Sequence, residues 1–79
     1  MTNIEKYRQV FLTLFGVNEK ELPKLTYQGV DAWDSVGHME LIAGLEETFN
    51  IMFETDDIID FNSFLKGHEI LSKYGISLN

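Results

Sequence analysis

The chain contains, close together, three residues of the types that serve in nucleophilic catalysis, namely Asp34, Ser35 and His38. On a helix, residues three apart lie on the same face, so the Ser35 hydroxyl could reach the His38 ring. A serine nucleophile also needs a group that orients its base and a pocket that excludes water. A chain of 79 residues has little material for such a pocket. The sequence therefore disfavours a self-contained hydrolase.

Ser35 alone allows two interpretations, because it stands where a helix is expected to begin. A serine at a helix N-terminus commonly accepts a hydrogen bond from an unpaired backbone N–H group and so caps the helix. The same N–H groups, with the positive end of the helix dipole, also favour a phosphate ester on that serine. The residue types around Ser35 do not decide between a helix cap and a modification site.

Residues 56–62 hold three Asp and one Asn, a composition that loosely resembles a calcium-binding loop. An EF-hand loop needs oxygen ligands at its third and fifth positions and glycine at its sixth. Counted from Asp56, the third position is Ile58 and the sixth is Phe61, so the pattern fails. The chain has no cysteine, and its two histidines fall on different expected helices. We therefore expect no metal site and no disulfide, and His68 is expected to be a hydrogen-bonded residue at the edge of the core.

Helical periodicity and capping signals predict the elements that position these residues. Thr2 and Glu5 have the spacing of a capping box, and apolar residues follow at helical steps. We expect helices over about residues 3–15 and 35–49, a short helix over 55–60, and a last helix from 62 or 63 to about 74. Asp34 is expected to cap the second helix. Gly16 and Asn50 favour the left-handed conformation that ends helices.

The second expected helix has a broad apolar face, which we expect to pack in the core. Its members are Val36, Met39, Ile42, Ala43, Leu45 and Phe49. Residues 16–34 are predicted to form a long connector that its own apolar side chains hold against the helices. The predicted fold is all-α: a small helical bundle of three main helices plus one short helix, with a long first loop, as a single domain over residues 1–79.

The charge of the chain is one-sided. It has 13 acidic and 6 basic residues and a net charge of −7, and residues 31–60 contain no Lys or Arg. Such a surface repels nucleic-acid phosphates and anionic membranes and attracts proteins with basic patches. The chain has no apolar run of about 20 residues that would span a membrane and no apolar signal segment at its start. We expect a cytoplasmic monomer.

The second expected helix resembles the prosthetic-group helix of acyl carrier proteins. From Asp34 to Phe49 the chain reads DSVGHMELIAGLEETF, which follows without gaps the family's pattern of Asp-Ser-Leu, Glu-Leu, Leu-Glu-Glu and an aromatic residue. The helix order, the long first loop and the acidic balance agree over essentially the whole chain. The resemblance implies that a phosphopantetheinyl transferase attaches the 4′-phosphopantetheine of coenzyme A to Ser35. The arm would carry acyl or aminoacyl groups as thioesters, and the protein itself would be no enzyme.

The resemblance also implies partner enzymes with basic patches, namely a loading ligase and downstream synthases or transferases. By their position in the motif, the partner-binding residues would be Asp34, Val36, Met39, Glu40, Ala43, Glu46, Glu47, Asp56 and Asp57. The chain departs from the usual pattern at Trp33, Val36 and Glu54, where a small residue, Leu and Pro are common. These departures favour a specialised pathway, such as polyketide, aminoacyl or cell-envelope polymer synthesis, over primary fatty-acid synthesis. The alternative function is an unmodified acidic protein-interaction domain of the same fold.

Overall fold

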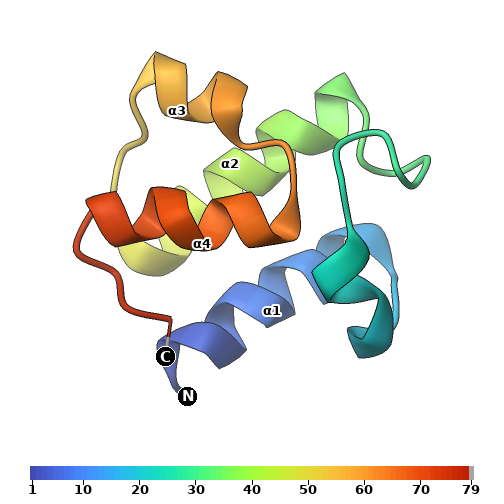
Figure 1. Cartoon of the computed structure of the whole chain (residues 1–79), viewed down its shortest axis with the longest axis horizontal. Coiled ribbons are helices and arrows are strands. Elements are labelled where there is room, and N and C mark those ends of the chain that lie inside the picture. The colour runs from blue at the N-terminus through green and yellow to red at the C-terminus, as the bar shows by residue number, and fades with distance from the viewer. Residues whose placement is uncertain (79) are drawn as a thin grey trace.

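The computed structural model describes residues 1–78, which form a small bundle of helical segments (Figure 1). The segments are α1 (Asn3–Phe15), η1 (Glu19–Lys24), α2 (Ser35–Phe49), α3 (Thr55–Asp60) and α4 (Phe64–Lys73). The two ends of the described chain lie side by side (Figure 1), where the Asn3 side chain donates a hydrogen bond to the Ser77 carbonyl oxygen at 3.1 Å. The predicted all-α bundle of three main helices and one short helix is confirmed.

Local hydrogen bonds set the helix ends at the predicted residues. The Thr2 hydroxyl accepts from the Glu5 N–H at 3.3 Å, and the Glu5 carboxylate accepts from the Thr2 N–H at 2.9 Å, which completes a capping box. Gly16 is the C-terminal cap of α1 and Asn50 that of α2. Both residues adopt the left-handed backbone conformation, with φ of 62° and 54°. Ser63, one of the two expected starting residues, caps α4 with its side-chain oxygen.

The connector between α1 and α2 is more ordered than predicted, because it contains the 3₁₀ helix η1. Backbone hydrogen bonds then tie it to the start of α4. The Tyr27 N–H donates to the Asn62 carbonyl oxygen at 2.8 Å, and the Phe64 N–H donates to the Leu25 carbonyl oxygen at 3.0 Å. Leu25, which was expected to pack the connector, is buried. The connector is therefore a fixed part of the bundle.

Aromatic rings fill the centre of the bundle. Phe11 is fully buried, and its ring centroid lies 5.0 Å from those of Tyr7 and Phe64 and 5.6 Å from that of Trp33. The Tyr7 hydroxyl donates to the Phe64 carbonyl oxygen at 2.6 Å, so this buried polar group has a partner. A Cβ atom at Gly67 would overlap the Tyr7 hydroxyl, so the missing side chain lets α4 approach α1.

α2 buries only part of the predicted apolar face, since Ile42 and Leu45 are buried as predicted and Phe49 is half-buried. Its buried apolar side chains are Leu41, Ile42 and Leu45. Val36 is 68% exposed, Met39 is 54% exposed and Ala43 is also exposed. The prediction that these three residues belong to the core face is wrong, because residues at steps of three and four from Val36 lie on the opposite side from Leu41 and Leu45.

Asp57 of α3 is buried, with 6% of its surface exposed. Its carboxylate accepts hydrogen bonds from the Lys73 ammonium group and from the Tyr74 hydroxyl, the latter at 2.6 Å. The bond from Lys73, followed by the bond from Tyr74, holds the pKa of Asp57 below its ordinary value of 3.8. The expectation that Asp57 belongs to an exposed partner-binding surface is corrected, because this side chain fastens α3 to the end of α4.

The substitution Asp57→Asn should lower the free energy of unfolding at neutral pH, because the neutral amide cannot form an ion pair with Lys73. Since the pKa of Asp57 in the folded state lies below 3.8, its carboxylate stabilises the fold above that pH. This contribution is lost as the pH falls through the lowered pKa. The difference between wild type and variant should therefore shrink from about pH 7 to about pH 3 in urea unfolding.

The matched control is Asp60→Asn, which removes an exposed carboxylate from the same helix. This variant should stay close to wild type in stability at neutral pH, because exposed charges contribute little. Equal losses in the two variants would contradict the structural role of Asp57.

Candidate functional site

Ser35 is the first residue of α2, and its side chain is exposed. The helix cap is the residue before it, because the Asp34 carboxylate accepts a hydrogen bond from the Gly37 N–H at 2.8 Å. The Ser35 oxygen instead lies 3.2 Å from the Tyr27 hydroxyl on the connector. Asp34 therefore provides the N-terminal cap of α2, as expected. The interpretation of Ser35 as the helix cap is wrong.

A tight turn in the connector brings Ser35 to this position. The Gln28 N–H donates to the Trp33 carbonyl oxygen at 2.9 Å, and the Trp33 N–H donates to the Val30 carbonyl oxygen at 3.1 Å. Gln28 is left-handed, with φ of 64°, which turns the chain back on itself. The Trp33 side chain is fully buried. Because this anchor comes just before Asp34 and Ser35, both of these residues are held at the surface.

His38 is bonded to Trp33 and to α3. The Trp33 indole N–H donates to Nδ1 of His38 at 3.0 Å, so the proton of the neutral imidazole is on Nε2. Nε2 then donates to the Ile58 carbonyl oxygen at 2.8 Å. Both ring nitrogens are occupied, and within residues 1–78 His38 makes no hydrogen bond to Ser35. The serine–histidine pair considered from the sequence is therefore not formed.

Five of the residues expected to contact partners form an exposed stripe along α2, which we call the α2 stripe. Its members are Val36, Met39, Glu40, Ala43 and Glu47. They recur at helical steps after Ser35, so they share one side of the helix. Asp34 is also exposed, at the start of the same helix. The stripe combines apolar side chains with two carboxylates.

Glu46 is placed differently from the α2 stripe. It is half-buried, and its carboxylate accepts a hydrogen bond from the Phe53 N–H at 2.9 Å. This bond holds the segment that leads from α2 to α3. Glu46 therefore has a structural contact in addition to the partner-binding role that the resemblance implies.

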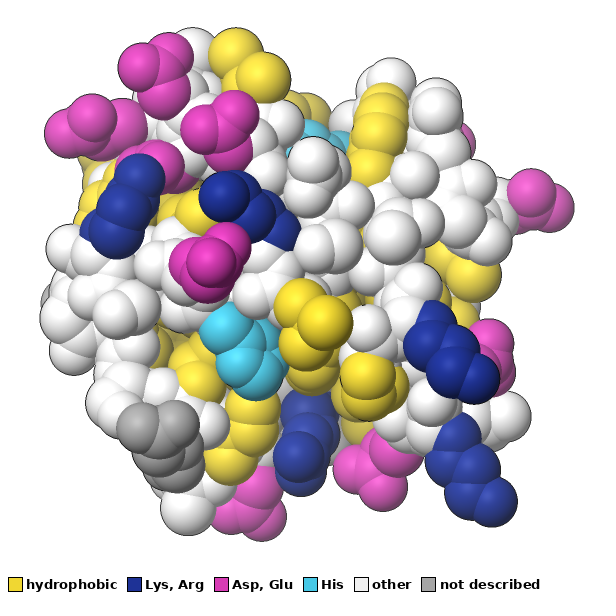
Figure 2. All heavy atoms as spheres, viewed as in Figure 1, with side chains coloured by type: hydrophobic (Ala, Val, Ile, Leu, Met, Phe, Trp, Pro, Cys, Tyr) yellow, Lys and Arg dark blue, Asp and Glu magenta, His cyan; other side chains and the backbone are white. Residues whose placement is uncertain are grey.

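Acidic side chains also gather over α3, at the top left of Figure 2. Asp56 and Asp60 are exposed on this helix. Ile59 beside them is 71% exposed, although the sequence suggested no role for it. A helix of six residues is too short for its periodicity to assign an outward face. α3 thus adds a second surface on which an apolar side chain stands among carboxylates.

A hollow of about 230 Å³ lies where the connector, α2 and α3 meet. It is lined by Tyr27, His38, Ile58, Ile59, Phe61 and Asn62. This volume is below the range of about 300–1,000 Å³ that is typical of small-molecule sites. The Tyr27 hydroxyl also contacts Ser35, and sequence reasoning missed this contact because no periodic pattern links a connector residue to a helix start.

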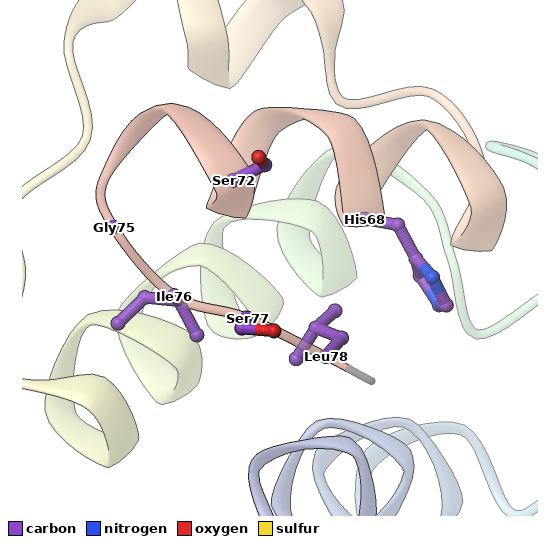
Figure 3. A pocket seen from close by; sticks show the side chains of 6 residues that line it. All are labelled: His68, Ser72, Gly75, Ile76, Ser77 and Leu78. Atoms are coloured by element: carbon purple, nitrogen blue, oxygen red, sulfur yellow. The ribbon is translucent and has the colours of Figure 1, made fainter.

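A second hollow, of about 360 Å³, lies between α4 and the segment after it (Figure 3). His68 and Ser72 line it from α4, and Ile76 and Leu78 line it from the segment that follows. Nε2 of His68 is buried and has no hydrogen-bond partner within residues 1–78, so the expectation of a hydrogen-bonded ring is wrong. Burial, with a smaller effect of the Arg8 charge, lowers the pKa of His68 below its ordinary value of 6.5.

The described residues provide neither a cluster of metal ligands nor a membrane-spanning helix. Within residues 1–78, no group of three or more His, Asp or Glu side chains is arranged to hold a metal ion. The Asp57 carboxylate, part of the loosely calcium-like segment, is engaged by Lys73 and Tyr74. None of the helices in this part of the chain has the length and apolar character needed to cross a membrane.

Comparisons of the chain with protein-family models, with curated proteins and with solved structures give no match.

Asp34→Ala should lower the free energy of unfolding by about 1 kcal/mol, because the Gly37 N–H loses its acceptor at the start of α2. Ser35→Ala should lower it by clearly less, since its oxygen makes only a surface contact with Tyr27. Urea unfolding followed by circular dichroism measures both values. A larger loss for Ser35→Ala than for Asp34→Ala would assign the cap to Ser35 and not to Asp34.

Proposed function

We propose that the chain is an acyl carrier protein modified by 4′-phosphopantetheine on Ser35. The observation that carries the proposal is the division of roles at the start of α2, where Asp34 caps the helix and the Ser35 hydroxyl is exposed. The resemblance of the segment from Asp34 to Phe49 to a prosthetic-group helix supports the same function. In this role the protein presents acyl or aminoacyl groups to other enzymes and catalyses no reaction itself.

The N-terminus of α2 suits the chemistry of this modification. In the active site of the transferase, the Ser35 oxygen attacks the pyrophosphate of coenzyme A. A phosphodiester forms, the hydroxyl proton leaves and adenosine bisphosphate departs. The negative charge of the diester then lies at the positive end of the helix dipole, which stabilises it. The arm supplies a thiol to a chain that has no cysteine, and a thioester transfers its acyl group readily because a thiolate is a good leaving group.

The α2 stripe is the proposed contact surface for partner enzymes. Its carboxylates, Glu40 and Glu47, are exposed beside the apolar side chains of Val36 and Met39. Basic patches on a phosphopantetheinyl transferase, a loading ligase and a downstream synthase or transferase would complement these charges and steer the encounter. The need for coenzyme A and for these enzymes fits a cytoplasmic protein.

An unmodified acidic interaction domain is the second candidate function. It is favoured by the exposed apolar residues Val36 and Met39, which stand beside carboxylates and could serve a basic partner without any prosthetic group. The two functions differ in whether Ser35 accepts the arm, so a loading experiment separates them.

Incubation with coenzyme A and a broad-specificity phosphopantetheinyl transferase should add the mass of one phosphopantetheinyl group to the wild-type protein. Ser35→Ala should gain no mass and stay folded, because Asp34 keeps the helix cap. Intact-protein mass spectrometry measures the gain, and circular dichroism checks the fold. If a folded wild-type protein gains no mass with two different transferases, the carrier function is excluded in favour of the interaction domain.

Charge reversal on the α2 stripe should slow this loading. Glu40→Lys and Glu47→Lys should each reduce the loading rate by roughly tenfold at low salt, and the reduction should shrink as salt screens the charges. The matched control is Glu69→Lys, which makes the same charge change at an exposed position on α4. A time course of mass gain gives the rates. Equal reductions in all three variants would show that net charge matters and the α2 stripe does not.

A further inference from the structure

The rings beside Ser35 limit what this carrier can shelter. We propose that the group carried on Ser35 is short or polar and stays outside the bundle, because Trp33 and His38 close the interior next to the attachment site. This inference rests on the proposed function and adds a class of cargo to it, namely acyl groups of a few carbons or acyl groups that carry hydroxyl, keto or amino functions.

A tethered acyl chain is subject to the hydrophobic effect. Methylene groups on the end of the arm lose free energy when they leave water, so a long chain enters any apolar space that it can reach. One such space lies where the connector, α2 and α3 meet. Tyr27 borders this space, with its hydroxyl 3.2 Å from the Ser35 oxygen. The cargo that the protein can cover therefore depends on what fills the bundle behind Tyr27.

Two stacked rings fill that part of the bundle. The Trp33 indole and the His38 imidazole have centroids 6.2 Å apart and planes at 14° to each other. Trp33 also stacks on Phe15 at a centroid distance of 5.3 Å, and its ring meets that of Phe11 at 5.6 Å. The Trp33 side chain is fully buried among these rings. Packed aromatic side chains thus occupy the route from the surface near Ser35 to the centre of the bundle.

Hydrogen bonds hold these rings in place. The Trp33 N–H donates to His38 at 3.0 Å, and His38 donates to the Ile58 carbonyl oxygen at 2.8 Å. An alkyl chain that displaced the His38 ring would offer no hydrogen-bonding atom. It would leave the buried indole N–H and the Ile58 carbonyl group unpaired, which is unfavourable in a low-dielectric interior. Polar groups therefore oppose insertion of a chain in addition to the packing.

Tyr27, which contacts Ser35, lines a surface hollow of about 230 Å³. His38 and Phe61 contribute to its lining, and Tyr27 and Asn62 add a hydroxyl and an amide group. A small cargo can rest against this surface and use these polar groups. A long alkyl chain would extend beyond the hollow into water.

The test loads the wild-type protein with arms that carry acetyl, hexanoyl and dodecanoyl groups, each supplied as the acyl-coenzyme A. The Tm and the fluorescence emission of Trp33, the single tryptophan, are then measured. Because no chain enters the bundle, the Tm should differ by less than about 2 °C between the acetyl and dodecanoyl forms. The emission should stay that of a buried indole. A Tm that rises with chain length, or an emission shift with dodecanoyl, would overturn the inference.

The variant His38→Ala tests the role given to the imidazole ring. Removal of this half-buried ring opens space next to Ser35, so the dodecanoyl form of the variant should melt higher than its acetyl form. The matched control is Tyr74→Ala, which removes a half-buried, hydrogen-bonded ring at the end of α4. Its Tm should be lowered equally for all three arms. A response of His38→Ala that does not depend on chain length would overturn the role of His38.

These outcomes separate the inference from the function on which it rests. A protein that gains the mass of the arm and then shelters dodecanoyl contradicts the inference and leaves the carrier function standing. A folded protein that gains no mass contradicts the carrier function, and the inference is overturned with it.

Discussion

The hydrogen bond from the Trp33 indole to His38 joins three parts of the molecule that local sequence signals leave independent. Trp33 ends the connector, His38 belongs to the first turns of α2, and the other imidazole nitrogen reaches α3 at Ile58. The indole is fully buried, so it also attaches this junction to the aromatic centre around Phe11. A single anchored side chain thereby sets where α2 begins, and with it the position of Ser35.

The ion pairs of the described chain lie outside the α2 stripe. The described chain pairs the buried carboxylate of Asp57 with Lys73, and Lys66 lies 3.4 Å from Glu69 on α4. Both ion pairs lie away from the α2 stripe, in a chain that has only six basic residues. The carboxylates of the α2 stripe, Glu40 and Glu47, are exposed, and residues 31–60 contain no Lys or Arg. Charges in this arrangement contribute little to folding and are suited to attract a basic partner.

The helix bounds could be predicted because a nearby side chain sets each end, as Gly16 and Asn50 do for α1 and α2. The outward face of α2 could not be predicted from the sequence. Apolar residues occupy most of the circumference of this helix, and Val36 is as apolar as the buried residues. The burial of Asp57 was equally hidden, since its partner Lys73 is 16 residues further along the chain. Local signals predict where an element lies, and contacts between distant residues decide which side of it is buried.

The candidate site was predictable to the same extent. The motif around Ser35 was enough to identify this residue as a candidate. The roles of its neighbours depend on contacts between residues that are distant in the sequence. Trp33 looked only like a departure from a family pattern, yet its burial holds Ser35, the proposed attachment residue, at the surface. The same burial fills the space that a carried chain would need, so firm placement of Ser35 and an open interior beside it are competing demands in a bundle of this size. This chain meets the first demand with a large ring that has a hydrogen-bond partner. In the proposed carrier function, the cargo is therefore constrained by the same interaction that positions Ser35.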